Sequence, residues 1–311
     1  MTTRKAPVRI LAALAIAAAM TLSGCDFFSQ LQLPFELPQI DLPEIDLSGI
    51  GIDLTPTSVE EAEQARQEAT VPEVSSPTVV QEGYLTVGID ATAGAPLYIA
   101  GSAGEATGMD VDIAAALAQE LGLKVRFVEL QGSSDAAAAT CDVVMAVSSK
   151  SSGGLTVVGG YAENAIAFFH RGEQTVVSAG DLGGMTVGVQ SGSASQRELE
   201  KSGASVSVQE FANLNEAFDA LDAGTVDYVL CDAYSGAYLA AIHPGIACAG
   251  TINDPSAIGI GVASGNAELQ TAVQGALEEI STNGVMGIVR SRWIGSMGNL
   301  SGESRVQGLS S

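Results

Sequence analysis

The chain has 311 residues, of which 36 are acidic and 13 are basic, so its formal net charge at pH 7 is −23. This acidity opposes binding to DNA, RNA or an anionic lipid surface, and it excludes nucleic acid as an expected partner. Apart from one apolar run near the N-terminus, no stretch of the sequence is long and apolar enough to span a bilayer.

Residues 1–24 have the pattern of an export signal. Arg4, Lys5 and Arg9 form a short positive segment, and the apolar run 10–22 that follows is short for a membrane span. The run ends in the letters LSGC, whose last residue is Cys25. Small residues directly before a Cys resemble the bacterial lipobox, in which the Cys is acylated, for example with palmitate. We therefore predict a lipid anchor on Cys25, with an ordinary signal peptide or an uncleaved anchor as the alternatives.

Residues 25–82 have the composition of an acidic, Pro-rich tether rather than of a packed domain. Between 31 and 54, prolines recur and Ile or Leu alternates with Asp or Glu. Proline-rich sequence favours an extended chain, and a flexible coil of about 57 residues spans roughly 40 Å. The alternative is a partner-binding segment that adds a strand to another protein's sheet.

From residue 84 onward, strand and helix patterns alternate. β-Branched residues predict a strand at 84–89, and helical spacing predicts a helix at 110–121 that Gly122 ends. The apolar run 142–148 is typical of a strand buried on both faces. Further strands are expected at 124–130, 165–170, 185–190, 226–230, 246–251 and 258–263, and further helices from 193 or 195 and at 213–224, 234–243, 266–283 and 285–293. This alternation predicts an α/β fold with mostly parallel sheets, of a length that suits two lobes.

Three cysteines follow Cys25 in the sequence. A disulfide between Cys231 and Cys248 is the preferred pairing if one forms, and the alternative is that these two and Cys141 are small buried thiols. The only histidines are far apart in sequence, and no C-x-x-C motif is present. We therefore expect no metal site, no cofactor and no general base, and hence no enzyme.

Short motifs occur in a characteristic order along the folded part: LTVGID at 85–90, GMDVDIA at 108–114, CDVVMA at 141–146, GMTVGVQSG at 184–192, LDAGTVD at 221–227 with Asp232 after it, IGIGV at 258–262, and the terminal segment 288–295 with Trp293. Together they resemble the bacterial extracytoplasmic solute-binding proteins, family 3, of the polar amino acid type. The resemblance implies the type II periplasmic binding fold, in which each of two lobes is a mostly parallel sheet flanked by helices. It places lobe 1 at 83–164 and 254–297 and lobe 2 at 165–253, with hinge crossovers between them and a disordered tail at 298–311.

The resemblance also implies a ligand site between the lobes, at the carboxyl ends of strands. Gln190, Ser191, Gly192 and Ser193 form a turn before a helix, where free N–H groups suit a carboxylate. Asp232 follows a strand and corresponds to the family residue that binds an ammonium group. The bland alternatives are a capped loop for the turn and a helix N-cap for the aspartate.

Three further residues complete the expected site. Asp90 follows the first strand, where it either lines the site or caps the turn. Ser148 is the last residue of the strand predicted at 142–148, and Ser149 follows it. That loop lacks the arginine with which family members grip a carboxylate. Lys150 either replaces it or is a solvated loop lysine, so the ligand is left open. Asp110 opens a helix and is expected to interact with its dipole.

The sequence therefore predicts a substrate-binding lipoprotein of an ABC importer, on the outer face of the cell membrane. It would capture a small polar solute, such as an amino acid, and deliver it as a monomer to an ABC permease. The alternatives are an extracytoplasmic sensor and, less favoured, a lyase-type enzyme on the same fold.

Overall fold

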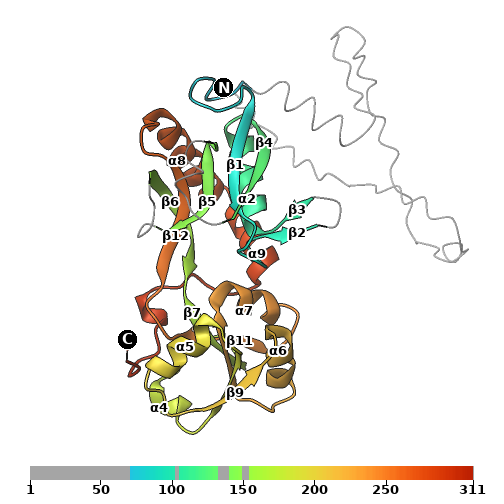
Figure 1. Cartoon of the computed structure of the whole chain (residues 1–311), viewed down its shortest axis with the longest axis vertical. Coiled ribbons are helices and arrows are strands. Elements are labelled where there is room, and N and C mark those ends of the chain that lie inside the picture. The colour runs from blue at the N-terminus through green and yellow to red at the C-terminus, as the bar shows by residue number, and fades with distance from the viewer. Residues whose placement is uncertain (1–70, 102–104, 132–139, 149–153, 311) are drawn as a thin grey trace, which may run out of the picture. The chain divides into compact units, whose positions relative to one another are not determined.

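The computed structural model describes residues 71–101, 105–131, 140–148 and 154–310 (Figure 1). The predicted signal, Cys25, most of the predicted tether and Ser149 lie outside these ranges. Within them, no helix is both long and apolar enough to cross a bilayer.

The first sheet has the strand order β4-β1-β5-β12-β6. Its strands are β1 (Tyr84–Asp90), β4 (Lys124–Leu130), β5 (Val143–Ser148), β6 (Leu155–Asn164) and β12 (Ser256–Ala263). β1 pairs in parallel with β4 and β5, whereas β12 is antiparallel to β5 and β6. The accompanying helices are α2 (Met109–Glu120), α8 (Ala267–Thr282) and α9 (Val285–Ile294), and a small hairpin pairs β2 (Ile99–Ala100) with β3 (Ala106–Thr107).

The second sheet has the order β11-β7-β10-β8-β9. Its strands are β7 (Ile166–Arg171), β8 (Thr186–Gln190), β9 (Ser207–Phe211), β10 (Tyr228–Asp232) and β11 (Ile246–Thr251), and its helices are α4 (Ala179–Leu182), α5 (Ala194–Lys201), α6 (Leu214–Asp222) and α7 (Ala233–Ala240). β8 is parallel to β9 and β10, and β7 is antiparallel to β10 and β11. Two sheets flanked by helices confirm the predicted α/β class.

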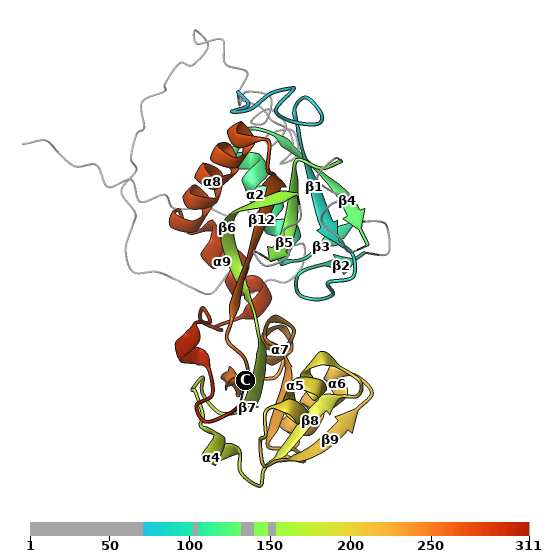
Figure 2. The ribbon, with the colours of Figure 1, turned by 60° about the vertical axis from the view of Figure 1, so that its left-hand side comes forward.

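The chain passes from one sheet to the other twice. β6 leads directly into β7, and β11 leads through residues 252–255 into β12 (Figures 1 and 2). The two crossovers are bonded to each other, because Ile166 N–H donates to Asn253 Oδ1 at 2.8 Å and Ile252 N–H donates to Ile166 O at 2.9 Å. The two crossovers coincide with the boundaries between the predicted lobes, and their role as hinges stays a prediction.

Helix α2 shows how sequence builds the core of the first sheet. Ile113, Leu117 and Leu121 recur at helical spacing, and each is fully buried. Gly108 precedes the helix with a φ of 144°, and a Cβ there would lie 2.2 Å from the carbonyl oxygen of Leu97. Glycine at this position therefore permits the close approach that starts the helix.

The folded part extends beyond both of its predicted ends. Before residue 83, Val74 and Val79 are buried, and Asn266 Nδ2 donates to Thr78 O at 2.8 Å. The tether predicted to reach 82 therefore ends in residues that pack on the first sheet. Two valines among polar neighbours gave too weak a pattern to predict this packing.

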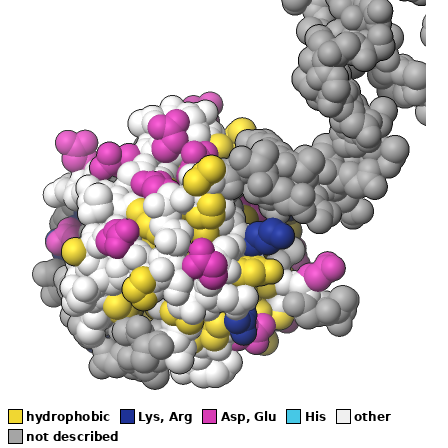
Figure 3. All heavy atoms as spheres, turned by 90° about the horizontal axis from the view of Figure 1, so that it is seen from above, with side chains coloured by type: hydrophobic (Ala, Val, Ile, Leu, Met, Phe, Trp, Pro, Cys, Tyr) yellow, Lys and Arg dark blue, Asp and Glu magenta, His cyan; other side chains and the backbone are white. Residues whose placement is uncertain are grey.

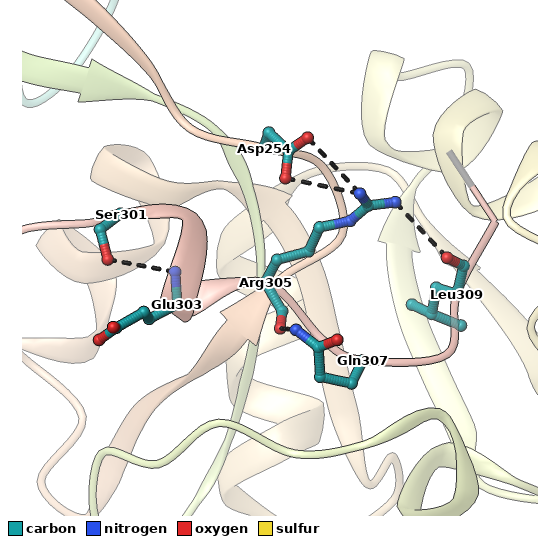
Figure 4. Close-up of polar contacts among 6 residues, drawn as sticks. All are labelled: Asp254, Ser301, Glu303, Arg305, Gln307 and Leu309. Carbon is teal, nitrogen blue, oxygen red and sulfur yellow. Dashed lines mark hydrogen bonds and ion pairs between the residues drawn. The ribbon is translucent and has the colours of Figure 1, made fainter.

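The expectation of a disordered tail at 298–311 is wrong for 298–310. Leu300 and Val306 are buried, and Val306 N–H donates to Thr251 O at 2.9 Å. Arg305 extends toward Asp254 of the second crossover, with 3.5 Å between Nη1 and Oδ1, and its other guanidinium nitrogen faces Leu309 O (Figure 4). Two buried apolar side chains, together with these polar contacts, hold the segment against the edge strand β11.

The preferred disulfide between Cys231 and Cys248 is absent, and both are free, buried thiols, as is Cys141. Cys231 lies on β10 and Cys248 on β11, and β7 lies between these strands. Strands two places apart are separated by roughly 10 Å, which exceeds the Cα separation that a disulfide spans. Burial raises the pKa of the Cys231 thiol well above its ordinary value, as expected for an unreactive structural cysteine.

Candidate functional site

In each sheet, candidate residues lie at the carboxyl ends of two adjacent parallel strands. Asp90 ends β1 and Ser148 ends the neighbouring β5. In the second sheet, Gln190 ends β8 and Asp232 ends the neighbouring β10. Open α/β sheets bind ligands at strand ends of this kind. The residues predicted from the sequence thus lie in two pairs, each pair at the ends of neighbouring strands.

The turn after β8 has the geometry of a capped loop. Gly192 has a φ of 71°. Ser193 is the N-cap of α5, and its Oγ accepts from Gln196 N–H at 3.1 Å. Ser191 N–H donates to Phe211 O at 2.9 Å, and Gly192 N–H donates to Gln196 Oε1 at 2.7 Å. The backbone donors that would hold a carboxylate are therefore occupied by the protein itself in this structure.

A carboxylate of the protein also stands beside this turn. Glu210 on β9 accepts from Ser191 Oγ at 2.5 Å and from Gln196 Nε2 at 2.9 Å. A bound anion would have to displace the Gln196 amide and tolerate the Glu210 charge. The sequence indicated that this turn suits a carboxylate. Because its nearest charge is negative, the turn is better suited to a hydroxyl or ammonium group.

Asp232 is the N-cap of α7, and its Oδ1 accepts from Ser235 N–H at 2.8 Å. The residue is solvent-exposed, yet desolvation by the surrounding protein raises the pKa of its carboxyl, and the hydrogen bonds from Ser235 and from Tyr234 N–H oppose the rise. The carboxylate of Asp232 thus serves as the cap of α7, with Oδ1 as the acceptor for Ser235 N–H.

On the first sheet, Asp90 closes the turn after β1. Its Oδ1 accepts from Thr92 N–H at 2.8 Å and from Thr92 Oγ1 at 2.6 Å, which is the capping geometry that was one of the two expectations. Ser148 is half-buried and lies opposite Ile258 in the sheet. Ser149 and Lys150 are outside the described ranges, so the stretch that lacks the family arginine is described only up to Ser148.

Helix α7 links the candidate site to both sheets. Ser235 Oγ donates to the Ala95 carbonyl, in the loop after β1, at 3.1 Å. Tyr234 Oη donates to Glu163 on β6 at 2.9 Å and accepts from Arg290 on α9 at 3.0 Å. Burial is the main cause that raises the pKa of Tyr234 to about 12, so the phenol stays protonated and able to donate.

Sequence reasoning missed a buried carboxyl at Asp110. The side chain is fully buried rather than exposed at a helix end, and its Oδ1 accepts from Tyr161 Oη at 2.6 Å. Its Oδ2 has no hydrogen-bond partner. The one local indication of burial was that Asp110 lies between two apolar residues, Met109 and Val111. Its hydrogen-bond partner, Tyr161 on β6, is 51 residues away and could not be predicted from the local sequence.

The comparisons with known proteins now decide the family. The profile of the bacterial extracellular solute-binding proteins, family 3, matches residues 85–296. The chain belongs to this family. No curated protein matches the sequence. Residues 71–84 and 297–310, which pack on the two sheets, lie outside the family match.

Solved structures agree with this assignment. An ancestral cationic amino acid solute-binding protein is 25% identical, with a TM-score of 0.57 over 68% of this chain and 96% of its own. A polar amino acid ABC uptake transporter substrate-binding protein from Streptococcus thermophilus is 17% identical, with a TM-score of 0.62 over 71% of this chain and 89% of its own. The second substrate-binding domain of GlnP from Lactococcus lactis is 19% identical, with a TM-score of 0.57 over 71% of this chain and 100% of its own. The two-lobed periplasmic binding fold is thereby confirmed.

The surface of this solute-binding protein matches its composition. Seen from above, Asp and Glu side chains are spread over the visible face and interspersed with apolar ones (Figure 3). Lys and Arg side chains are few on this face and do not gather into a patch (Figure 3).

Proposed function

We propose that the chain is the substrate-binding lipoprotein of an ABC importer and that it captures a small polar solute, an amino acid or a close relative, between its two sheets. The observation that carries the proposal is the family match over residues 85–296, combined with candidate side chains at adjacent parallel strand ends in both sheets. Lobe 1 would comprise 83–164 and 254–297, lobe 2 would comprise 165–253, and the two bonded crossovers would form the hinge.

Asp232 is the proposed partner of the solute's ammonium group, and Asp90 with Ser148 would face it from the first sheet. The turn at 190–193 would contact a hydroxyl or a second ammonium group of the solute, because the nearest charge to this turn is the carboxylate of Glu210. Cys25 would carry the lipid, and the acidic segment after it would tether the domain near the permease on the outer face of the membrane.

The test is calorimetric titration of the purified protein with each of the twenty proteinogenic L-amino acids and with putrescine and spermidine as cations that lack a carboxylate. We expect saturable binding of at least one amino acid and an increase in the melting temperature with that compound. If none of these compounds binds, capture of an amino-acid-like solute is wrong.

A further inference from the structure

Strand β5 carries a bulge immediately before its solute-facing end. Val144 lies opposite Gly261 and Val147 opposite Gly259, so Met145 and Ala146 together face a single residue of β12. This count of two residues against one defines a β-bulge, a feature that bends a strand and redirects its side chains.

Ala146 holds the bulge in a strained backbone conformation. Its φ is 57°, and among the described residues it is the only one other than glycine with a positive φ. This region is unfavourable for a residue with a Cβ, so the surrounding structure must hold Ala146 there. The contacts that hold Ala146 in this conformation therefore bear on Ser148, which lies two residues further along the strand.

Two hydrogen bonds, made by Tyr161 and Asp110, hold Ala146 in this conformation. Ala146 N–H donates to Tyr161 Oη at 2.8 Å, and the same hydroxyl donates to Asp110 Oδ1 at 2.6 Å. Tyr161 lies on β6 and is 6% exposed, and Asp110 lies on α2 and is 0% exposed. A phenol that accepts from the bulge and donates to a buried carboxyl is fixed in one orientation, because both of its hydrogen-bonding roles are used.

We propose that Asp110 is a positioning residue for solute binding: through Tyr161 it fixes the Ala146 bulge and so sets the direction in which β5 presents Ser148 to the solute. The proposal rests on the proposed function for its binding role, whereas the link from Asp110 to the bulge stands on the geometry alone. If the bulge were lost, the register of the strand end would shift by one residue, and the side chains of Val147 and Ser148 would exchange faces.

The experiment compares Tyr161→Phe, Asp110→Val and Asp110→Asn with the wild-type protein. Tyr161→Phe keeps the ring and removes only the hydroxyl. Asp110→Val removes the acceptor, whereas Asp110→Asn keeps one and should rescue the network. Tyr228→Phe, which removes the hydroxyl of a buried tyrosine at the other end of β10 from Asp232, is the matched control. Two readouts are taken: amide hydrogen exchange of the peptide 143–148 without ligand, and calorimetric titration with each proteinogenic L-amino acid.

We expect exchange at 143–148 to be at least about tenfold faster in Tyr161→Phe and Asp110→Val, and affinity for the bound amino acid to fall about tenfold. Asp110→Asn and Tyr228→Phe should show neither faster exchange at 143–148 nor weaker affinity than the wild type. Unchanged exchange and affinity in Tyr161→Phe would overturn the proposal even if Asp110→Val fails to fold. Faster exchange in a protein whose wild type binds no amino acid would leave the bulge link intact and contradict the proposed function instead.

Discussion

At the scale of single residues, Asp110 makes stability depend on pH. Its full burial is the main cause that raises the pKa of the carboxyl from an ordinary value near 4 to about 7, the negative charge of Asp90 adds to the rise, and the hydrogen bond from Tyr161 opposes it. The folded state therefore binds a proton here more tightly than the unfolded state does. The stabilisation is fully present below about pH 4 and is lost as the pH rises to about 7.

We predict that replacing Asp110 with Asn removes this dependence. The wild-type free energy of unfolding should fall relative to that of the variant between pH 4 and 7, by an amount on the order of 4 kcal/mol, because a neutral amide has no proton to lose. Urea unfolding at pH 4, 5.5, 7 and 8 measures the difference. Glu120→Gln, at the exposed end of the same helix, is the control and should keep the wild-type slope. Parallel stability curves for wild type and Asp110→Asn would contradict the assignment.

Asp232 combines a structural task with the proposed binding task, and two substitutions separate them. Asn caps a helix about as well as Asp, so Asp232→Asn should change the free energy of unfolding by less than about 0.5 kcal/mol, whereas Asp232→Ala should lower it by about 1 kcal/mol. Both should weaken amino acid binding by about tenfold or more in calorimetric titration, because both remove the charge opposite the ammonium group. Wild-type affinity in Asp232→Asn would make this residue a helix cap only.

The candidate residues divide by what local sequence can reveal. Asp232 and the turn at 190–193 follow recognisable strands and precede helices, so their place at strand ends was predictable from the pattern. The role of Asp110 was not, because helical position alone indicated a dipole partner. Its actual partner, Tyr161, belongs to a strand that meets α2 only in the folded chain.

At the scale of elements, most strands and helices follow from periodicity, but β6, β9, α4 and the small β2–β3 hairpin were not predicted. The sequence of β6 contains Gly159 and Gly160, which usually weaken a strand. Here β6 and β12 approach so closely that a Cβ on Gly259 would lie 1.8 Å from the Gly159 carbonyl oxygen. β9 is an edge strand and is exposed at Ser207. Its sequence is largely polar, so it shows no clear strand pattern.

The C-terminal segment was expected to be a disordered tail, but it packs on the folded part. A substitution of Val306 tests this packing. Val306 is 1% exposed and is bonded to Thr251, so Val306→Ala should lower the free energy of unfolding by about 2 kcal/mol through lost methyl groups and the cavity left behind. Val208→Ala, at a residue 46% exposed on β9, should change it by less than about 0.5 kcal/mol. Chemical denaturation of both variants gives the comparison, and equal effects would mean that the segment does not pack in solution.

At the scale of the whole molecule, alternating strands and helices predicted two sheets, and the bonded crossovers between β6 and β7 and between β11 and β12 join them. α7 adds contacts through Ser235 and Tyr234 to the loop after β1, to β6 and to α9. Tyr238 of α7 also packs on Trp293 of α9, with ring centroids 6.2 Å apart. A solute that bound better to one arrangement of the sheets would shift the balance between arrangements only by its difference in affinity for them. Sequence could not reveal these contacts of α7, because each joins residues more than fifty positions apart.

Attachment to the membrane is the last property of the whole molecule that the sequence predicts, and Cys25 tests it. A thioether-linked lipid with further acyl chains would hold the protein at the membrane, since each buried methylene contributes about 0.8 kcal/mol and two or more chains give stable anchoring. Cys25→Ser should therefore move the protein from the membrane fraction and the detergent phase of a Triton X-114 extraction into the aqueous phase. Amino acid binding should be unchanged, because every residue proposed to contact the solute lies far along the chain from Cys25, at Asp90 and beyond. Cys141→Ala, which removes a buried thiol of the folded part, should leave the protein in the detergent phase. Retention of Cys25→Ser in that phase would show that the apolar run 10–22 stays attached as an uncleaved anchor, and that the lipid is not what holds the protein to the membrane.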